Sequence, residues 1–404
     1  MNSRWFAPLL LTGAFLGWLL AVLAPDQAWL FQITKIIQTS FLTALKMIIA
    51  PLIFFSLLSG VLQLRQASSS MGRLGGVTVS YYFVTSSIAI LIGLGVVFFI
   101  HPWTAHPPLT EMPAAPTGLL SQQDASIATL IQGILSDMLA NPFSALAELN
   151  ILGILTSALL LGLAAAWALP EDSAWPGMLT EVTNVVFTVA RWVLTTLPLG
   201  LFGIAHQLTA QVTLDTLVSL GQFAAVVFGA TLLHGLVILP LIAWWLTGIS
   251  PVTLFSKVGN TLFTAFVTSS SAATLPLSLR TAEQELGVDR NKAAFVLPLG
   301  ATINMDGTAL FEGIAAVYLA YMFGIELSSV MVVLIFLVAM LASAGAPGIP
   351  SGSLAGLQVV LLSVGIPLEG IALLLLIERP LDTFRTAVNV EGDLVGSMIA
   401  NKYS

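Results

Sequence analysis

The sequence contains no cysteine, and charged residues make up only 8% of its 404 positions. Without cysteine, the chain has no disulfide bond, no thiolate metal site and no cysteine nucleophile. The scarcity of charge excludes most soluble folds, because ordinary globular domains carry about 25% charged residues. Hydrophobic residues instead reach 57%. This composition is typical of helical proteins that cross a membrane several times, and we expect no nucleic-acid partner.

Apolar runs close to the length that a bilayer requires recur along the first half of the chain. The segment 102–145 separates two groups of them, and we expect a Pro-rich loop and a short helix there. The expected spanning helices are 6–24, 39–64, 76–101, 146–168, 182–210 and 215–247.

Basic residues predict how the chain is oriented in the membrane. Arg65 and Arg73 flank one loop, and Arg290 and Lys292 lie in another, whereas the loop 102–124 has neither Lys nor Arg. Cytoplasmic loops carry an excess of basic residues. We therefore expect both termini and the two basic loops in the cytoplasm, and the Pro-rich loop outside a cell inner (plasma) membrane.

Two later apolar stretches, 251–281 and 329–364, are each interrupted in the middle. The first interruption, 268–276, reads TSSSAATLP, and the second, 343–353, reads SAGAPGIPSGS. Neither carries a charge, and both are rich in residues that break a helix or satisfy free backbone groups. We interpret each as the tip of a re-entrant helical hairpin. An ordinary short turn between two spans is the alternative.

Each expected hairpin is followed by a helix with a polar interruption. After the first comes 304–308, which reads NMDGT, and after the second comes Asn389. The similar spacing indicates an internal repeat. Paired interrupted segments in two halves of a chain point to the binding site of a transporter at the membrane midplane.

The polar interruptions carry groups that bind cations. Asp306 follows Asn304, and Asp393 follows Asn389. Carboxylate, amide and backbone oxygens are hard ligands that suit sodium better than transition metals. Two buried aspartates that cap helix ends are the simpler reading.

The last apolar segment carries an unusual density of charge, in the stretch 382–393. A charged side chain at bilayer depth costs about 2.5–3.5 kcal/mol even on lenient scales, so these residues must pair, face a polar cavity or bind a ligand. Asp382 and Arg385 share one helix face. The guanidinium can bind a carboxylate and the aspartate an ammonium group. The pair therefore matches aspartate or glutamate, or forms a structural ion pair.

These motifs together resemble the dicarboxylate/amino acid:cation symporters, a family that includes glutamate/aspartate transporters of bacteria and archaea and the excitatory amino acid transporters of mammals. The resemblance runs nearly end to end. It is strongest in 45–52, 269–276, 304–309, 348–353 and 382–393. It implies an all-α fold of eight transmembrane helices plus two re-entrant hairpins, arranged as inverted repeats, in a homotrimer that works by an elevator mechanism.

The resemblance also implies a division into static and moving parts. The scaffold would comprise residues 1–75 and 146–210. The transport domain would comprise the helix 76–101 and residues 211–404, with the first hairpin at about 251–281 and the second at about 329–364.

The family's substrate contacts transfer to matching positions of this chain. Arg385 would hold the substrate's side-chain carboxylate and Asp382 its amino group, while the two hairpin tips would hold the main carboxylate. The full implied set is Arg385, Asp382, Asn389, Thr386, Thr308, Ser271, Ser270, Ile349, Pro350 and Ser353.

The same resemblance implies three sodium sites and no other cofactor. The first would use Asn389, Asp393 and the backbone of Gly300 and Asn304; the second the backbone of Thr302, Met305, Ser343 and Ala346; and the third Tyr82, Thr85, Ser86, Asn304 and Asp306.

Three positions depart from the family pattern. Many relatives carry a further arginine at the position of Ser269 or of Thr383, and this chain has neither. Arg379 either substitutes for that arginine or is a solvated residue at a helix end. Ser353 stands where glycine is usual. Glu312 matches the proton-coupled mammalian relatives, and a buried glutamate can carry a proton or form a permanent hydrogen bond. Whether protons are coupled stays open.

Other function classes fit less well. An intramembrane protease needs a Gly-x-Gly-Asp setting or a serine with a histidine partner, and Val390-Glu391-Gly392-Asp393 lacks the first glycine. We therefore expect no enzyme. Charged recognition residues also argue against a channel. We expect uptake of acidic amino acids with sodium. The alternative is a C4-dicarboxylate symporter, whose known members generally lack an aspartate at the position of Asp382.

Overall fold

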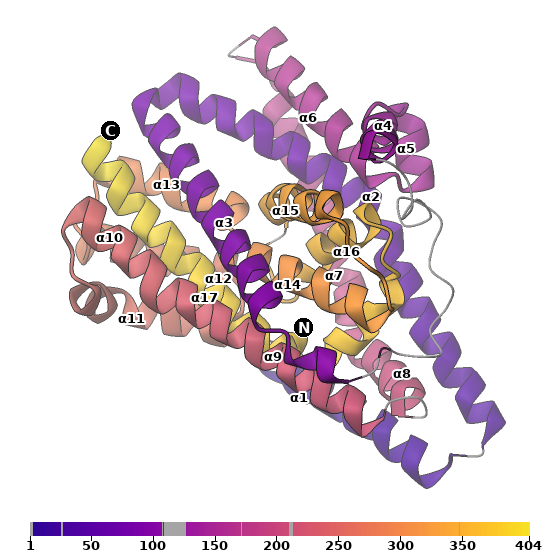
Figure 1. Cartoon of the computed structure of the whole chain (residues 1–404). Coiled ribbons are helices and arrows are strands. Elements are labelled where there is room, and N and C mark those ends of the chain that lie inside the picture. The colour runs from indigo at the N-terminus through magenta and orange to yellow at the C-terminus, as the bar shows by residue number, and fades with distance from the viewer. Residues whose placement is uncertain are drawn as a thin grey trace.

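The computed structural model describes residues 3–25, 27–106, 108, 127–170, 172–209, 213–346 and 348–404. Every regular element in these ranges is a helix, so the prediction of an all-α protein is confirmed (Figure 1). Most of the predicted Pro-rich loop, residues 109–126, lies outside the described residues.

The first half combines long and short helices. In chain order they are α1 (Ser3–Leu23), α2 (Ala28–Met71), α3 (Arg73–Phe99), η1 (Pro102–Ala105), α4 (Ile127–Met138), α5 (Pro142–Glu148), α6 (Ile151–Ala168), α7 (Trp175–Thr195), α8 (Leu197–Thr209), α9 (Leu214–Leu233), η3 (His234–Ile238) and α10 (Leu239–Thr247).

The second half is built from shorter helices and one long C-terminal helix. They are α11 (Pro251–Thr268), α12 (Ser271–Gln284), α13 (Arg290–Ile303), α14 (Asp306–Met322), α15 (Ser329–Ala344), α16 (Ser353–Ser363), η4 (Leu368–Gly370) and α17 (Ile371–Tyr403).

Five helices of the described chain are long and apolar enough to cross a membrane: Ala28–Leu62, Arg73–Ala105, Ile151–Ala168, Leu214–Thr247 and Arg290–Met322. A sixth span results if α7 and the following Leu197–Gln207 count together, although they bend by 46°. The count is therefore five or six by length and composition, against the eight that the resemblance implies. The first and last helices account for the difference, because the described apolar part of α1, Pro8–Leu23, is short and α17 is rich in charge.

Some predicted boundaries are wrong. The helix expected at 39–64 spans Ala28–Met71, which corresponds to about 66 Å of helix, with Pro51 inside it. The helix expected to begin at 146 begins at Ile151, because Asn150 caps its N-terminus and Leu149 adopts a left-handed conformation with φ of 57°.

The two interrupted stretches do form helical hairpins. In the first, the hydroxyls of Thr261 on α11 and Thr281 on α12 lie 2.7 Å apart, as expected for antiparallel neighbours. The turn between them is only Ser269 and Ser270. In the second, α15 packs on α16, with 345–346 and 348–352 at the tip.

The predicted break in the helix after the first hairpin is confirmed, since Asn304 and Met305 leave helical geometry between α13 and α14. The second predicted break is wrong, because α17 continues without interruption through Asn389. A Cβ on Gly392 would lie 2.7 Å from the Asn304 amide nitrogen, so α17 passes directly against the α13–α14 break. The helix therefore packs against the break and stays uninterrupted despite its polar residues.

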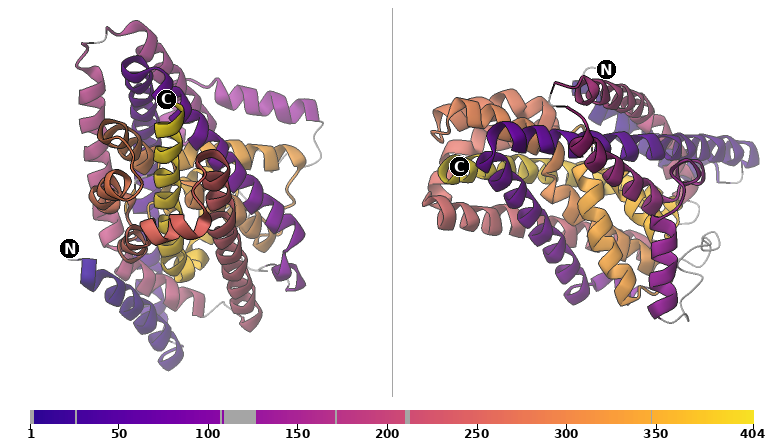
Figure 2. Two further views of the ribbon diagram at one scale, coloured as in Figure 1. Left: turned by 90° about the vertical axis from the view of Figure 1, so that its left-hand side faces the viewer. Right: turned by 90° about the horizontal axis from the view of Figure 1, so that it is seen from above.

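The C-terminal helix α17 is the axis of the second half. It contacts α9, α10, α11, α12, α13, α14 and α3, and Figure 2 shows it, in yellow, enclosed by them. One hydrophobic cluster surrounds α14, α15 and α16, and a second joins α11, α13 and the C-terminal part of α17. The charged stretch of α17 lies between the two clusters.

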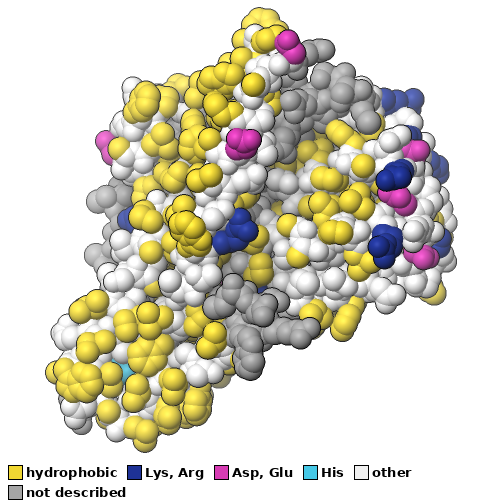
Figure 3. All heavy atoms as spheres, turned by 180° about the vertical axis from the view of Figure 1, so that it is seen from behind, with side chains coloured by type: hydrophobic (Ala, Val, Ile, Leu, Met, Phe, Trp, Pro, Cys, Tyr) yellow, Lys and Arg dark blue, Asp and Glu magenta, His cyan; other side chains and the backbone are white. Residues whose placement is uncertain are grey.

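Broad apolar areas cover the outside of the molecule. Figure 3 shows hydrophobic side chains over much of one face, while most of its charged side chains gather near one edge. Exposed residues such as Phe15 and Trp18 on α1 and Trp245 on α10 contribute to the apolar surface. Exposed apolar patches of this extent are expected where a protein faces lipid or a partner.

Candidate functional site

The two hairpin tips meet each other. Ser270 Oγ donates to the carbonyl oxygen of Gly348 at 2.7 Å, and the amide of Ala272 donates to the same oxygen at 3.2 Å. Ser270 also caps α12 by accepting from the amide of Ala273. The N-termini of α12 and α16 thus lie at the tips. Helix N-termini favour a negatively charged ligand.

Arg385 lies on α17 close to these tips, and its side chain is 1% exposed. Its Nη2 donates to Glu378 Oε1 at 2.9 Å and to Asp382 Oδ1 at 3.4 Å. The guanidinium also lies over the ring of Phe311 on α14. The predicted pair of Asp382 and Arg385 is therefore in contact, together with a second carboxylate that the sequence did not point to.

Two of the three guanidinium nitrogens, Nε and Nη1 of Arg385, are buried with no hydrogen-bond partner among the described residues. An unpaired buried donor on a charged group is costly. Each nitrogen can therefore donate to a carboxylate that enters the site. A structural ion pair alone would not leave these donors free.

Asp382 links α17 to the second hairpin. Its Oδ2 accepts from the backbone amide of Ser351 at 3.0 Å and from Arg379 Nη1 at 3.3 Å. Arg379 is partly exposed, with a side chain 23% accessible. Arg379 pairs with Asp382, as expected if it replaces the arginine that many relatives carry at the position of Ser269 or Thr383.

Asn389 and Thr308 also come together. Asn389 Nδ2 lies 3.3 Å from Thr308 Oγ1, and Asn389 Oδ1 accepts from the amide of Gly307 at 2.7 Å. A Cβ on Gly307 would lie 2.7 Å from the carbonyl oxygen of Arg385. The start of α14 is thus packed directly on α17 beside the arginine, with Thr386 buried on the same helix.

Ser271, Ser353, Ile349 and Pro350 lie at the two tips, the serines buried and the other two half-buried. Ser353 Oγ donates to Glu378, so its contact runs through that glutamate. The predicted substrate residues therefore occupy one region, where the hairpin tips, the start of α14 and the middle of α17 converge.

Four of the five members of the third predicted sodium set form one cluster. Ser86 Oγ donates to Asp306 Oδ1 at 2.7 Å, and Thr85 Oγ1 lies 3.5 Å from both Asp306 Oδ1 and Asn304 Oδ1. The fifth, Tyr82, donates its hydroxyl hydrogen to the carbonyl of Val296 at 2.9 Å. The oxygens of this cluster are of the type that sodium prefers.

The first predicted sodium set is also assembled in large part. Asn304 Nδ2 donates to Asp393 Oδ1 at 3.0 Å. A Cβ on Gly300 would overlap both Asp393 Oδ1 and the Tyr82 hydroxyl, so the carboxylate lies against the glycine backbone. Asn389 lies one helical turn from Asp393 on α17 and directs its amide toward α14 instead.

The second predicted sodium set consists of backbone groups on two segments. The carbonyl of Met305 accepts from the amide of Ala309, and the carbonyl of Ser343 accepts from Ala346. A Cβ on Gly348 would lie 3.5 Å from the terminal carbon of Met305, so the second tip does approach the α13–α14 break near Thr302. These contacts bring the segments together without defining a cation geometry.

Glu312, the candidate proton carrier, is fully buried on α14. Neither of its carboxylate oxygens has a hydrogen-bond partner in the described part of the chain. A Cβ on Gly356 of α16 would overlap this carboxylate. Glu312 therefore lies directly against the second hairpin, with its oxygens free to hold a proton.

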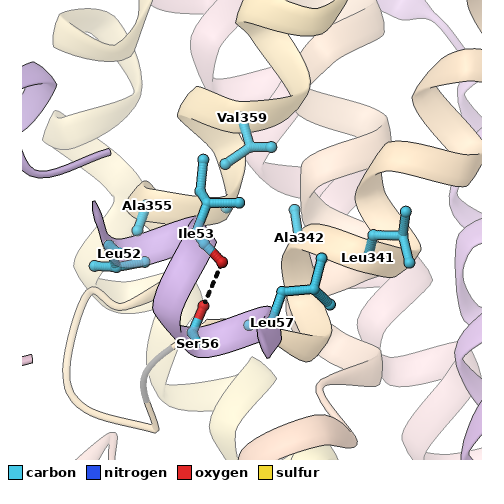
Figure 4. Close-up of a pocket in the computed structure, with 10 residues that line it drawn as sticks. Leu52, Ile53, Ser56, Leu57, Leu341, Ala342, Ala355 and Val359 are labelled. Atoms are coloured by element: carbon cyan, nitrogen blue, oxygen red, sulfur yellow. Dashed lines mark hydrogen bonds between the residues drawn. The ribbon is translucent and has the colours of Figure 1, made fainter. Parts of the chain in front are cut away.

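A small cavity separates the second hairpin from α2 (Figure 4). Its volume is about 10 Å³, enough for roughly one water molecule. Leu52, Ile53, Ser56 and Leu57 line it from α2, and small residues including Ala342 and Ala355 line it from the hairpin. The contact around the cavity is close, because a Cβ on Gly345 of the hairpin would lie 2.7 Å from Ser56 Oγ on α2.

Three buried titratable residues near these sites were not assigned a role from sequence. Glu378 pairs with Arg385; His234 Nε2 lies 3.1 Å from Asp306 Oδ2; and Glu391 Oε1 has no partner among the described atoms. Glu378 lies seven residues before Arg385, so helical periodicity could have placed it on the same face. A histidine inside an apolar span is itself a signal of a functional position.

Comparison with known proteins places the chain among transporters. A profile of the sodium:dicarboxylate symporter family matches residues 6–403. An excitatory amino acid transporter of Caenorhabditis elegans is 31% identical, over 89% of this chain and 79% of its own length. Human excitatory amino acid transporter 2 is 31% identical, over 96% and 76%. Neutral amino acid transporter B(0) of Mus musculus is 30% identical, over 90% and 73%.

Proposed function

Because this chain belongs to the sodium:dicarboxylate symporter family, we propose that it takes up L-aspartate or L-glutamate together with sodium. Members of the family are membrane symporters, so the protein is a multi-pass transporter and not an enzyme. The similar proteins are named for excitatory and for neutral amino acids, so the substrate has to be inferred from the site.

The observation that carries the proposal is the buried Arg385 with two free donors. A buried guanidinium with unpaired donors favours a carboxylate, because a neutral side chain would leave these donors unpaired. Phe311 covers one face of the guanidinium and so restricts approach to the remaining directions. This environment supports a substrate with a side-chain carboxylate over a neutral amino acid.

Asp382 supports an amino acid over a C4-dicarboxylate. Its carboxylate accepts from Ser351 and Arg379 at 3.0 and 3.3 Å, and an ammonium group can join or replace these donors. A dicarboxylate without an amino group would meet a negative charge at this position. The C4-dicarboxylate alternative therefore requires Asp382 to act only as a partner of the arginines.

The clusters at Asp306 and Asp393 support sodium coupling. The Asp306 carboxylate lies beside the hydroxyls of Thr85 and Ser86, and Thr85 also contacts the Asn304 amide oxygen. The Asp393 carboxylate accepts from the Asn304 amide nitrogen and lies against Gly300. Both lie along the α13–α14 break that also borders Arg385 through Gly307. Sodium bound there would hold the α13–α14 break in one geometry and so position the substrate region beside it. Sodium binding and substrate binding would thereby be coupled.

For the architecture we propose eight spanning helices, with α1 and α17 added to the six apolar spans and the two hairpins re-entrant. Residues 1–75 and 146–210 form a static, trimeric scaffold. The helix 76–101 and residues 211–404 form the moving unit, which works by an elevator mechanism. The boundary between the two units then runs between α2 and the second hairpin, where small hairpin residues such as Ala342 and Ala355 face α2.

Both termini lie in the cytoplasm in this proposal. Lys292 Nζ donates to the carbonyls of Asn401 and Ser404, each at 3.0 Å. The C-terminus and the basic loop that contains Arg290 therefore share one side, as the distribution of basic residues requires.

Competition in proteoliposomes tests the substrate class. The purified protein should take up radiolabelled aspartate when sodium is supplied outside, and excess unlabelled aspartate or glutamate should block it. Excess alanine or serine should not. Equal inhibition by succinate would favour the dicarboxylate alternative, and inhibition by neutral amino acids alone would overturn the proposal.

A further inference from the structure

We propose that Glu378, with Ser351 and Ser353, forms a latch that ties the second hairpin tip to Arg385 and lets the tip close without a ligand. The inference rests on the proposed function, because it concerns access to the same pocket. It assigns a gating role to a glutamate that neither the sequence motifs nor the sodium clusters use.

The latch is a bridge of hydrogen bonds centred on one carboxylate. Glu378 Oε2 accepts from Ser351 Oγ at 2.9 Å, and Oε1 accepts from Ser353 Oγ at 3.1 Å. Oε1 also accepts from Arg385 Nη2 at 2.9 Å. Both carboxylate oxygens are thus occupied, and the tip is joined to the arginine through side chains of the protein alone. The glutamate is 1% exposed, so water does not compete for these bonds.

The backbone of Ser351 indicates that its hydroxyl has a specific use. Ser351 has φ of 60°, in the left-handed region that disfavours residues with a side chain. Glycine would adopt this conformation without strain. The backbone conformation therefore disfavours a serine at this position. The hydrogen bond from its hydroxyl to Glu378 offsets this cost.

The charges around the latch are balanced. Glu378 and Asp382 face Arg379 and Arg385, and the described ion pairs connect all four. A ligand carboxylate that binds the free donors of Arg385 would share the guanidinium with Glu378. The same arginine thus connects to the tip through Glu378 and to the ligand through Nε and Nη1.

This arrangement has a consequence for the transport cycle. An alternating-access carrier crosses the membrane both loaded and empty, and it has to close its gate each time. A bound amino acid can hold the tip in the loaded carrier. The latch would hold it in the empty carrier, so its loss should impair net uptake more than exchange of substrate for substrate.

Hydrogen–deuterium exchange on the full-length purified protein tests the latch directly. We compare the wild type with Glu378→Gln and with Ser351→Gly, all in sodium without amino acid. Amides of the segment 349–355 should exchange about tenfold faster or more in both variants, since each loses at least one charge-assisted bond between the tip and position 378. Ser363→Ala is the matched control, because among the described residues its hydroxyl bonds to Val360 of the same hairpin alone, and it should leave the tip unchanged.

Addition of saturating aspartate separates a lost latch from a damaged fold. In both variants aspartate should restore slow hydrogen–deuterium exchange of the tip amides. In proteoliposomes the variants should keep aspartate–aspartate exchange and lose most net uptake. Two results would overturn the latch. One is equal hydrogen–deuterium exchange of the tip in the wild type and both variants, and the other is an equal loss of aspartate–aspartate exchange and of net uptake in the variants.

The same data distinguish failure of the latch from failure of the proposed substrate. The comparison without amino acid needs no knowledge of the ligand. If aspartate slows tip exchange neither in the wild type nor in the variants, the substrate assignment is wrong. The difference in tip exchange between the wild type and the variants without amino acid still tests the latch.

Discussion

The guanidinium carbon of Arg385 lies 3.8 Å from the centre of the Phe311 ring, so the strongest positive charge of the site is held against an aromatic face. The ring covers one side of the guanidinium and leaves its edge for carboxylates. Two protein carboxylates accept from Nη2, and the other two nitrogens have no hydrogen-bond partner in the part of the chain that the structure describes. The substrate preference should therefore depend on this arginine above all other residues.

Replacement of Arg385 by cysteine should abolish uptake of aspartate and glutamate. The ligand carboxylate would lose a charge-assisted contact in a closed site, which costs about 2–5 kcal/mol and lowers affinity at least about thirtyfold. Uptake of neutral amino acids can remain. Arg379→Gln serves as the comparison and should have a smaller effect, because Arg379 is partly exposed. Aspartate affinity that is unchanged in Arg385→Cys contradicts the assignment.

Replacement of Gly300 by alanine should weaken sodium binding. The added Cβ would overlap the Asp393 carboxylate and the Tyr82 hydroxyl, and so displace the oxygens of the first proposed sodium set. We expect the sodium dependence of aspartate binding to shift to higher concentration. Gly313→Ala is the matched control on α14, since its Cβ would meet Leu94 at 3.6 Å, an ordinary contact distance. Equal sodium dependence in both variants would exclude a cation at Asp393.

Replacement of Glu312 by glutamine should remove any proton coupling and preserve substrate binding. Glutamine resembles the protonated acid, and the free oxygens of Glu312 leave room for the amide. Uptake by the wild type should acidify the liposome lumen and depend on external pH between about 5.5 and 8. The variant should lose both effects. Wild-type transport that is independent of pH over this range would make Glu312 a structural residue only.

Replacement of Gly356 by alanine should disturb the packing of the second hairpin on α14. A Cβ at this position would overlap the buried Glu312 carboxylate. Overpacking of this kind costs about 1–3 kcal/mol, which should lower the melting temperature of the purified protein. Gly95→Ala is the control, because no atom lies within 4 Å of its added Cβ. The double variant Gly356→Ala/Glu312→Ala should recover part of the loss; no recovery would show that the glutamate does not cause it.

The sequence identified the hairpin tips and the α13–α14 break because these features are local. Serine, glycine and proline disfavour continuous helix, and the run NMDGT combines two residues that favour helix caps with a glycine. The structure ends α11 at Thr268 and breaks at Asn304 as expected, but α12 starts at Ser271, so the first interruption is shorter than the predicted 268–276. The same reasoning failed at Asn389, because packing of α17 against the break outweighs the low helix propensity of its polar residues.

The contacts within the site could not be read from periodicity. His234 and Asp306 are separated by 72 residues, and Ser351 and Glu378 by 27. No local rule pairs residues that far apart, so the roles of Thr85 and Ser86 came from the family resemblance alone. Glu378 precedes the charged stretch from Asp382 to Asp393, so it lies outside the motif that indicated the site. The short apolar helices are a further limit, since neither α1 nor α17 is recognised as a span by composition.

Isothermal titration of L-aspartate and L-glutamate into the purified protein, at low and at high sodium, tests the central claim most directly. Sodium-coupled binding predicts saturable heats at high sodium and an affinity that falls at least about tenfold when sodium is lowered, with the ionic strength held constant by choline. Linkage then requires aspartate to raise the apparent sodium affinity by the same factor. Binding of an acidic amino acid that is equally strong at both sodium concentrations, or no binding at either, would contradict the account.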